Sequence, residues 1–253
     1  MTSIRKRLAA LMALAALIWS ATAAAYDLKP IVVQLSPTGA GSGQTLVITN
    51  SHDVPIAIEV RAYRRQQMPN GEDTLTPEEE DLLIYPPQMV IPPQTSQSFK
   101  VQWVGDPAPT RELAYRIVTE QLPIKFTQEI EAGSNADLTV RYRYEAALYI
   151  VPSNAEPSAR LTSISRVTAE DGSEQLELRI ASEGTMRAIL DTPRVTVKGT
   201  SGESVVLSGE QIQPLDGFNV LPGVERIIRI AAPAGLPTGP LTGELDTRYV
   251  VLE

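Results

Sequence analysis

The chain consists of short runs of strand-forming residues that are interrupted at close intervals by turn signals. Runs rich in Val, Ile, Leu, Thr and Tyr alternate with segments such as SPTGAGSG, NSHDVP, MPNGED and GDPAPT, and the sequence holds 20 prolines and 16 glycines. Proline breaks helices and central strands, whereas glycine suits turns. No amphipathic run of helix length is present. The sequence therefore predicts an all-β fold.

A polar segment, SNAEPSAR, follows Pro152 and separates two groups of strand-type runs. Seven runs precede it and further runs follow it, and such spacing is typical of immunoglobulin-like sandwiches of about 100 residues each. We expect an N-terminal domain over residues 26–152 and a C-terminal β-sandwich domain over 153–253. Within the first domain, TLTPEEEDLL is expected to form one helical turn, because Thr76 can cap it and Pro77 suits its first position.

The first 25 residues are expected to be a signal peptide. Basic residues at 5–7 precede an apolar run over 8–19, and small residues follow. The apolar run is shorter than the ~20 residues of a membrane-spanning helix, so cleavage at Ala23 or after Ala25 is favoured over an uncleaved anchor. The mature chain is then an exported protein without stable membrane insertion.

The net charge narrows the classes of partner, and the cysteine content narrows the ways in which the fold can be stabilised. The net charge is −8, and it becomes −11 without the leader, which holds three cations and no acid. Nucleic acid and anionic membranes require a basic face, so neither is an expected partner. The chain has no cysteine, so hydrophobic burial must stabilise it without disulfides.

The patterns that indicate catalysis are missing from the sequence. The one histidine, His52, lies in a predicted turn without the oriented partners that base catalysis needs. The acidic run at 78–81 lacks the alternating spacing of a calcium loop. G-x-S-x-G, H-E-x-x-H, phosphate-loop and C-x-x-C motifs do not occur. We expect a binding protein, not an enzyme, with no cofactor or metal. A glycosidase is a distant alternative, since two carboxylates far apart in sequence suffice.

The stretch DLTVRYRYEAALYIVP, residues 137–152, alternates more cleanly than any other part of the chain. One face of the predicted strand carries Leu138, Val140, Tyr142 and Tyr144. The opposite face carries Thr139, Arg141, Arg143 and Glu145. Alternation predicts a strand with one buried face, but it does not distinguish packing in the protein's own core from packing in a partner.

Several motifs occur together in a characteristic order. RELAYRIVTEQLP opens with Arg111 and Glu112 and closes with Leu-Pro. YPPQMVIPPQTSQSFKVQW holds a Pro-Pro pair, a short strand, a proline, a turn and a strand with a central basic residue, Lys100. AALYIVP and NVLPGVERIIRI follow further along. In this order and spacing, over nearly all of residues 26–253, the motifs resemble those of the periplasmic pilus chaperone (PapD-like) family.

The resemblance implies two immunoglobulin-like domains set at an angle, with a cleft between them. It implies a periplasmic chaperone of a Gram-negative bacterium that captures fimbrial or pilin subunits by donor-strand complementation and delivers them to an outer-membrane usher. Leu138, Val140, Tyr142 and Tyr144 would be the residues lent to the subunit's groove. An open donor edge also invites self-association. The alternative hypothesis is a secreted immunoglobulin-like structural or adhesion module of a surface fibre.

The sequence departs from the family at the residues that bind the subunit's C-terminal carboxylate. The family uses an arginine on the first strand and a lysine near the end of the seventh, but Val32 and Ala147 align with them here. A buried carboxylate needs a cationic or backbone donor, so we expect a substitute. The candidate anchors are Lys29, Lys100, Arg141 and Arg143. The long connection IKFTQEIEAGSNAD, without cysteine, favours an archaic-type or divergent branch.

Overall fold

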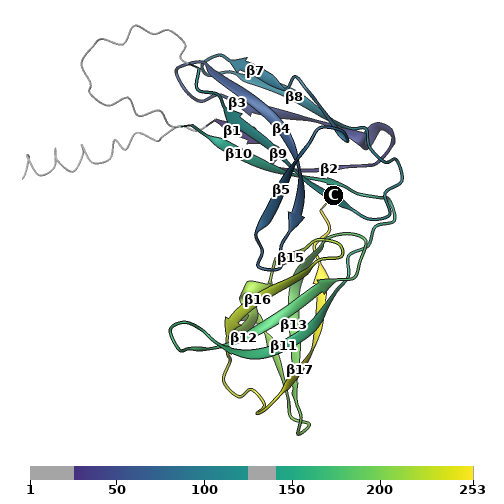
Figure 1. The fold of residues 1–253 in the computed structure, drawn as a ribbon, viewed down its shortest axis with the longest axis vertical. Coiled ribbons are helices and arrows are strands. Elements are labelled where there is room, and N and C mark those ends of the chain that lie inside the picture. Colours follow the sequence, from purple (N-terminus) through teal and green to yellow (C-terminus); the bar gives the residue numbers. More distant parts are fainter. Residues whose placement is uncertain (1–25, 125–140, 253) are drawn as a thin grey trace, which may run out of the picture.

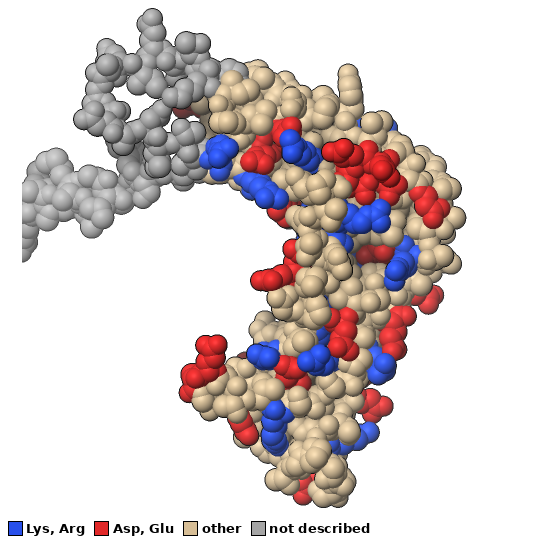
Figure 2. Space-filling model, in the orientation of Figure 1, with Lys and Arg blue, Asp and Glu red and all other residues tan. Residues whose placement is uncertain are grey.

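The computed structural model describes residues 26–124 and 141–252, which form two β-sandwich domains (Figure 1). The predicted all-β class with two immunoglobulin-like domains is confirmed. The molecule is bent, and Figure 2 shows a hollow between the two domains. The expected signal peptide lies outside the described residues, as do Leu138 and Val140. Among the described residues, no helix has the length and apolar character required to span a membrane.

The first domain is a sandwich of two sheets whose inner faces bury one apolar core. The four-stranded sheet has the order β1-β3-β8-β6, and the six-stranded sheet has the order β2-β10-β9-β4-β5, with β7 also paired to β4. The strands are β1 (Asp27–Lys29), β2 (Val32–Leu35), β3 (Gly43–Thr49), β4 (Ile56–Gln67), β5 (Asp73–Glu78), β6 (Leu82–Tyr85), β7 (Gln88–Ile91), β8 (Ser96–Trp103), β9 (Leu113–Gln121) and β10 (Arg143–Ile150), and a short 3-10 helix, η1 (Gly39–Ser42), precedes β3.

Alternation along the strands explains this packing. In β8, Phe99, Val101 and Trp103 are buried while their neighbours are exposed or half-buried. Each apolar side chain of such a strand points to one face, so the pattern decides which face joins the core. Near Pro30 the chain passes from the four-stranded sheet to the six-stranded sheet, so β1 and β2 lie in different layers.

The expectation of a helical turn in TLTPEEEDLL is wrong, because the first half of this segment belongs to strand β5 and its last two residues begin strand β6. Residues Asp73–Glu78 pair with the outer half of the long strand β4, from Ala62 to Gln67. The unpaired half of β4 would otherwise expose its backbone groups. Pro77 is tolerated because β5 is an edge strand, where a missing N–H costs no ladder hydrogen bond.

The second domain is also a two-sheet sandwich with its own apolar core. A three-stranded sheet, β11-β12-β16, faces a four-stranded sheet in which β13 pairs with β14, β15 and β17. The elements are β11 (Ala159–Thr168), β12 (Glu174–Ser182), β13 (Ala188–Gly199), β14 (Ser204–Ser208), the 3-10 helix η2 (Gly209–Leu215), β15 (Asn219–Val220), β16 (Glu225–Ala231) and β17 (Leu241–Tyr249).

The hairpin of β4 and β5 bridges the two domains (Figure 1). The Gln67 side chain donates to the carbonyl of Asn219 at 3.1 Å and accepts from the amide of Leu221 at 3.0 Å. The amide of Ile227 donates to the carbonyl of Pro69 at 2.8 Å. These bonds satisfy backbone groups of the second domain, so the hairpin fixes the position of one domain relative to the other.

Candidate functional site

Strand β10 has two halves with different neighbours. Residues from Ala147 to Ile150 pair in parallel with β2, whereas Arg143 to Ala146 pair only with β9. Within residues 26–124 and 141–252, no strand pairs with the other side of this first half. An unpaired edge of this kind can accept a strand from another chain.

The hydrogen-bond alternation identifies the backbone groups on this open edge. The amide of Gln121 on the β9 side donates to the carbonyl of Tyr142 at 3.0 Å, and the amide of Ala147 donates to the carbonyl of Ile31 at 2.9 Å. In an antiparallel pair, successive residues direct their backbone groups alternately toward and away from the neighbour. The N–H and C=O groups of Arg143 and Glu145 therefore point away from β9, at the open edge.

The two predicted donor residues that the structure describes lie on the inner face of the sheet. Tyr142 and Tyr144 are half-buried and pack against the core of the first domain. The ring of Tyr144 meets the ring of Tyr26 edge-on, with centroids 4.6 Å apart, and the Tyr26 hydroxyl donates to the Thr119 carbonyl at 2.7 Å. The two tyrosines thus cover the end of the domain's own core, next to the open edge.

The structure does not bring the four predicted anchor residues together. Lys29 and Lys100 belong to the four-stranded sheet, where Lys29 pairs with Asp27 at 2.7 Å and Lys100 is exposed. Arg143 lies on β10 and pairs with Glu145 at 3.0 Å. Arg141 is exposed and lies two residues before β10 begins. Arg143 alone among them is a strand residue of the six-stranded sheet.

Val32 and Ala147, which we expect from the sequence to stand at about the positions of the family's basic pair, are direct neighbours on adjacent strands. On the other side of Ala147, β9 places Arg116 directly opposite. Residues opposite one another in neighbouring strands point to the same face. Val32, Ala147 and Arg116 therefore form one row across three strands, on the outer face of the sheet, and Arg116 supplies a cation next to the position where the family has lysine.

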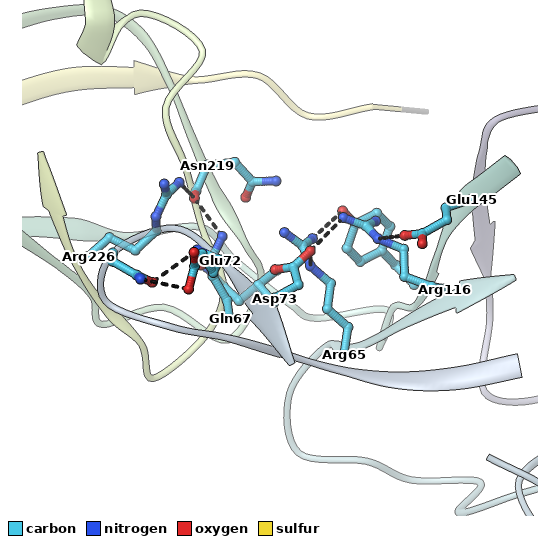
Figure 3. A network of polar contacts seen from close by, with 11 residues as sticks. Arg65, Gln67, Glu72, Asp73, Arg116, Glu145, Asn219 and Arg226 are labelled. Atoms are coloured by element: carbon cyan, nitrogen blue, oxygen red, sulfur yellow. Dashed lines mark hydrogen bonds and ion pairs between the residues drawn. The ribbon is translucent and has the colours of Figure 1, made fainter. Parts of the chain in front are cut away.

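Arg116 belongs to a ladder of charges that crosses the outer face of the sheet (Figure 3). Asp73 accepts from Arg65 at 2.7 Å and from Arg116 at 3.0 Å. Glu145 lies 4.0 Å from Arg116 and 3.0 Å from Arg143. The ladder contains three arginines and two carboxylates, so it carries one surplus positive charge. Only 8% of the Arg65 side chain and 17% of the Arg116 side chain are exposed, which limits screening by water.

Sequence reasoning missed Arg116 and Arg65 as candidate anchors. Arg116 lies in the middle of a strand whose neighbours Tyr115 and Ile117 are fully buried. A cation inside such an apolar run indicates a charged partner nearby, because a buried central strand rarely carries an unpaired charge. This pattern in the sequence could have identified Arg116 as a candidate.

A buried ion pair at the domain junction holds the covered half of β10. Arg187 of the second domain bonds Glu112, directly before β9, at 2.6 Å, and both side chains are almost fully buried. The Arg187 guanidinium also stacks 3.9 Å from the ring centroid of Tyr149 and donates to Gln34 at 3.0 Å. One side chain thus contacts β10, β2 and the residue directly before β9. Burial raises the pKa of Glu112 to about 7, because desolvation outweighs the attraction of Arg187.

Other charged groups have structural partners. Glu78 and Asp81, in the acidic run, both pair with Arg64, at 3.3 Å and 2.8 Å. His52 lies in the turn that its neighbour Asn50 organises, since the His52 amide donates to the Asn50 side chain at 2.9 Å. The part of the chain that the structure describes contains no cluster of three or more His, Cys, Asp or Glu residues suited to a metal ion.

Solved structures of fimbrial chaperones have a similar fold. A chaperone–tip adhesin complex of CFA/I fimbriae biogenesis shares 14% identity at a TM-score of 0.54, over 89% of this chain and 99% of that chain. The class 5 fimbriae chaperone CfaA gives the same TM-score and identity, over 90% and 100%. The CsuC–CsuE pre-assembly complex from archaic chaperone-usher Csu pili of Acinetobacter baumannii shares 11% identity at a TM-score of 0.50, over 81% and 90%. No curated protein sequence matches the chain.

Residues 31–156 match the family model described as the N-terminal domain of PapD, a pili and flagellar-assembly chaperone. This segment contains β2 to β10, including the open edge and the charge ladder. The chain belongs to the PapD-like family, and its function is that of a pilus-assembly chaperone. The resemblance inferred from the motifs is confirmed, whereas the archaic-type or divergent branch stays a prediction.

Proposed function

We propose that the chain acts in the periplasm and captures pilus subunits by lending them the first half of β10. The observation that carries this proposal is the unpaired edge of that half, where Arg143 and Glu145 direct their backbone groups outward. A subunit that lacks one strand of its own sandwich can pair with these groups. Main-chain hydrogen bonds then supply affinity and alternate side chains supply fit. No catalytic step, cofactor or metal is required.

Tyr144 on the inner face of β10, and Tyr142 directly before this strand, are suited to the subunit's groove. Tyr142 and Tyr144 are half-buried at the end of the core, so they retain apolar surface that a partner can cover. Leu138 and Val140 continue the alternation in the sequence and lie outside the described residues. We assign all four the role of donor residues. Each aromatic ring that a partner buries contributes a large apolar area.

We further propose that Arg116, supported by Arg65, holds the subunit's C-terminal carboxylate. The surplus positive charge of the ladder favours an incoming anion, and guanidinium groups bind carboxylates through two parallel hydrogen bonds. Arg116 stands opposite Ala147, so the cation reaches this position from β9 and not from β10. Of the four anchors expected from the sequence, we keep only Arg143, in a supporting role: it pairs with Glu145, which in turn lies next to Arg116. Delivery to an outer-membrane usher is the expected next step.

Co-expression with a small β-rich secreted subunit, followed by affinity purification and mass spectrometry, tests the capture step. Tyr142→Asp should abolish recovery of the subunit, because a charge would enter the apolar groove without a partner. Tyr85→Asp is the matched control, since Tyr85 is 74% exposed on β6, and recovery should persist. Circular dichroism checks that both variants are folded. Recovery of the subunit with Tyr142→Asp would contradict the donor assignment.

A further inference from the structure

The segment after the last strand crosses from the second domain to the outer face of the first. β17 ends at Tyr249, and the amide of Val250 still donates to the Ile189 carbonyl of the second domain at 2.9 Å. Two residues later, the Leu252 carbonyl accepts from the Gln34 side chain on β2 at 2.6 Å. Figure 1 shows this end of the chain beside β2, between the two domains.

Gln34 lies on the same face as the row of Val32, Ala147 and Arg116. Alternation along β2 places Val33 and Leu35 in the core, and Val32 and Gln34 outside. The side-chain oxygen of Gln34 accepts from Arg187 at 3.0 Å. Arginine has no acceptor, so this bond requires the oxygen of the amide to face Arg187 and leaves the NH₂ group free to donate elsewhere. Arg187 therefore orients Gln34 as a hydrogen-bond donor on this face.

A donor held in this way is suited to a carbonyl or carboxylate oxygen of an extended peptide. Here the acceptor is the Leu252 carbonyl of the chain itself. The segment that carries it, residues 250–252, is largely exposed to solvent, so burial stabilises it little. Val250 is 40% exposed, Val251 56% and Leu252 39%. Three apolar residues in succession with such exposure form a weakly attached segment, because burial is what stabilises apolar side chains.

We propose that residues 250–252 act as a displaceable internal ligand of the Gln34 site. They occupy the oriented donor in the free chaperone and leave when an extended peptide offers its own backbone oxygen. This inference rests on the proposed function only in identifying the incoming peptide as part of a subunit. The internal segment lowers the affinity of the site for weak peptides, and it keeps the Gln34 amide hydrogen-bonded until a partner arrives.

A peptide with the tail's own sequence tests the inference without any subunit. The probe is fluorescein-labelled RYVVL, residues 248–252, with an amidated end, and its anisotropy is measured with the full chain and with a form that lacks residues 251–253. The shortened form should bind the probe about tenfold more tightly, since the internal competitor is gone. Gln34→Ala in the shortened form should weaken binding about fivefold, the loss expected for one hydrogen bond.

Controls separate this inference from the capture mechanism. Gln88→Ala in the shortened form should leave probe binding unchanged, because the Gln88 amide bonds Glu59 on another part of the domain. Equal binding by the full and shortened chains, indifference to Gln34→Ala, or no binding at millimolar probe would each overturn the inference. The assay contains no subunit, so it can fail while subunit capture succeeds, and it can succeed while subunit capture fails.

Discussion

The two halves of β10 share one alternation but have different surroundings. The half from Ala147 to Ile150 lies between β9 and β2, and Arg187 of the second domain stacks on its Tyr149. The half from Arg143 to Ala146 has β9 on one side only, within the described residues. The covered half is therefore fixed to both domains, while the open half presents backbone groups to solvent, which can satisfy them until a partner does.

The contrast indicates how a protein can keep an exposed edge without aggregating. The open half carries Arg143 and Glu145 on its outer face, and charged side chains disfavour indiscriminate pairing of edges. The covered half supplies rigidity, so the open half is presented in one geometry. A preorganised strand loses less conformational entropy on binding than a mobile segment does.

Arg187→Ala should destabilise the covered half most. It leaves the buried Glu112 carboxylate without its partner, which costs about 3–5 kcal/mol of unfolding free energy. Denaturant unfolding measures the loss. Arg248→Ala is the matched control, because Arg248 pairs with Asp191 but is 75% exposed, and it should cost less than about 1 kcal/mol. Similar losses for the two variants would mean that Arg187 is not the central contact of the junction.

Proline substitutions at adjacent positions should distinguish the backbone groups of the open half that bond β9 from those that point to the open edge. Ala146→Pro removes a hydrogen bond to β9 and leaves a buried acceptor unpaired, so it should cost about 2 kcal/mol or more. Glu145→Pro removes an outward N–H and should cost less than about 1 kcal/mol, yet it should impair subunit capture strongly. Thermal unfolding and co-purification measure the two effects. Normal capture by Glu145→Pro would exclude this edge as the donor.

Acidification should raise the free energy of unfolding through Glu112. The pKa of Glu112 is raised to about 7 from its ordinary 4.5, so between these values the folded chain binds a proton that the unfolded chain lacks. The stability from this group is therefore fully present below pH 4.5 and is lost as the pH rises through about 7. Unfolding free energies of the wild type and Glu112→Gln, compared across this range, isolate the effect. A difference that did not change with pH would contradict the raised pKa.

Ala147→Lys should have the smallest effect on stability and should sharpen the anchor assignment. Arg116→Met should lower subunit capture about tenfold or more, as expected for the loss of a charge-assisted hydrogen bond. Lysine at 147 lies opposite residue 116, so Ala147→Lys should restore part of that loss. Arg179→Met in the second domain is the control and should leave capture unchanged. Failure of rescue in a folded double variant would place the anchor elsewhere.

Much of the fold was predictable because the strand signals are local. The alternation over residues 138–145 put Tyr142 and Tyr144 on one face of a strand, and the structure packs both against the core of the first domain. The failure at TLTPEEEDLL has a tertiary cause, since β4 is long enough to require a second partner and pairs with β5 there. Local capping residues could not reveal that requirement.

The candidate site was predictable only in part. The strand that carries Tyr144 was found from its alternation. The four anchors expected from the sequence lie apart: two belong to the four-stranded sheet, one begins β10 of the six-stranded sheet, and one precedes β10. Arg116 was missed because its place beside Ala147 depends on the pairing of β9 with β10. Contacts between residues far apart in sequence depend on register, which the sequence does not state explicitly.

The sequence by itself determined the β class, the two faces of the strand that became β10 and the family, because these depend on residue periodicity and on the order of local motifs. Only the tertiary structure decided which half of β10 is open, which cation stands in the row of Val32 and Ala147, and that Arg187 orients Gln34 toward residues 250–252. These features join strands and domains that are distant along the chain, and their geometry exists only once the sheets have paired and the domains have docked.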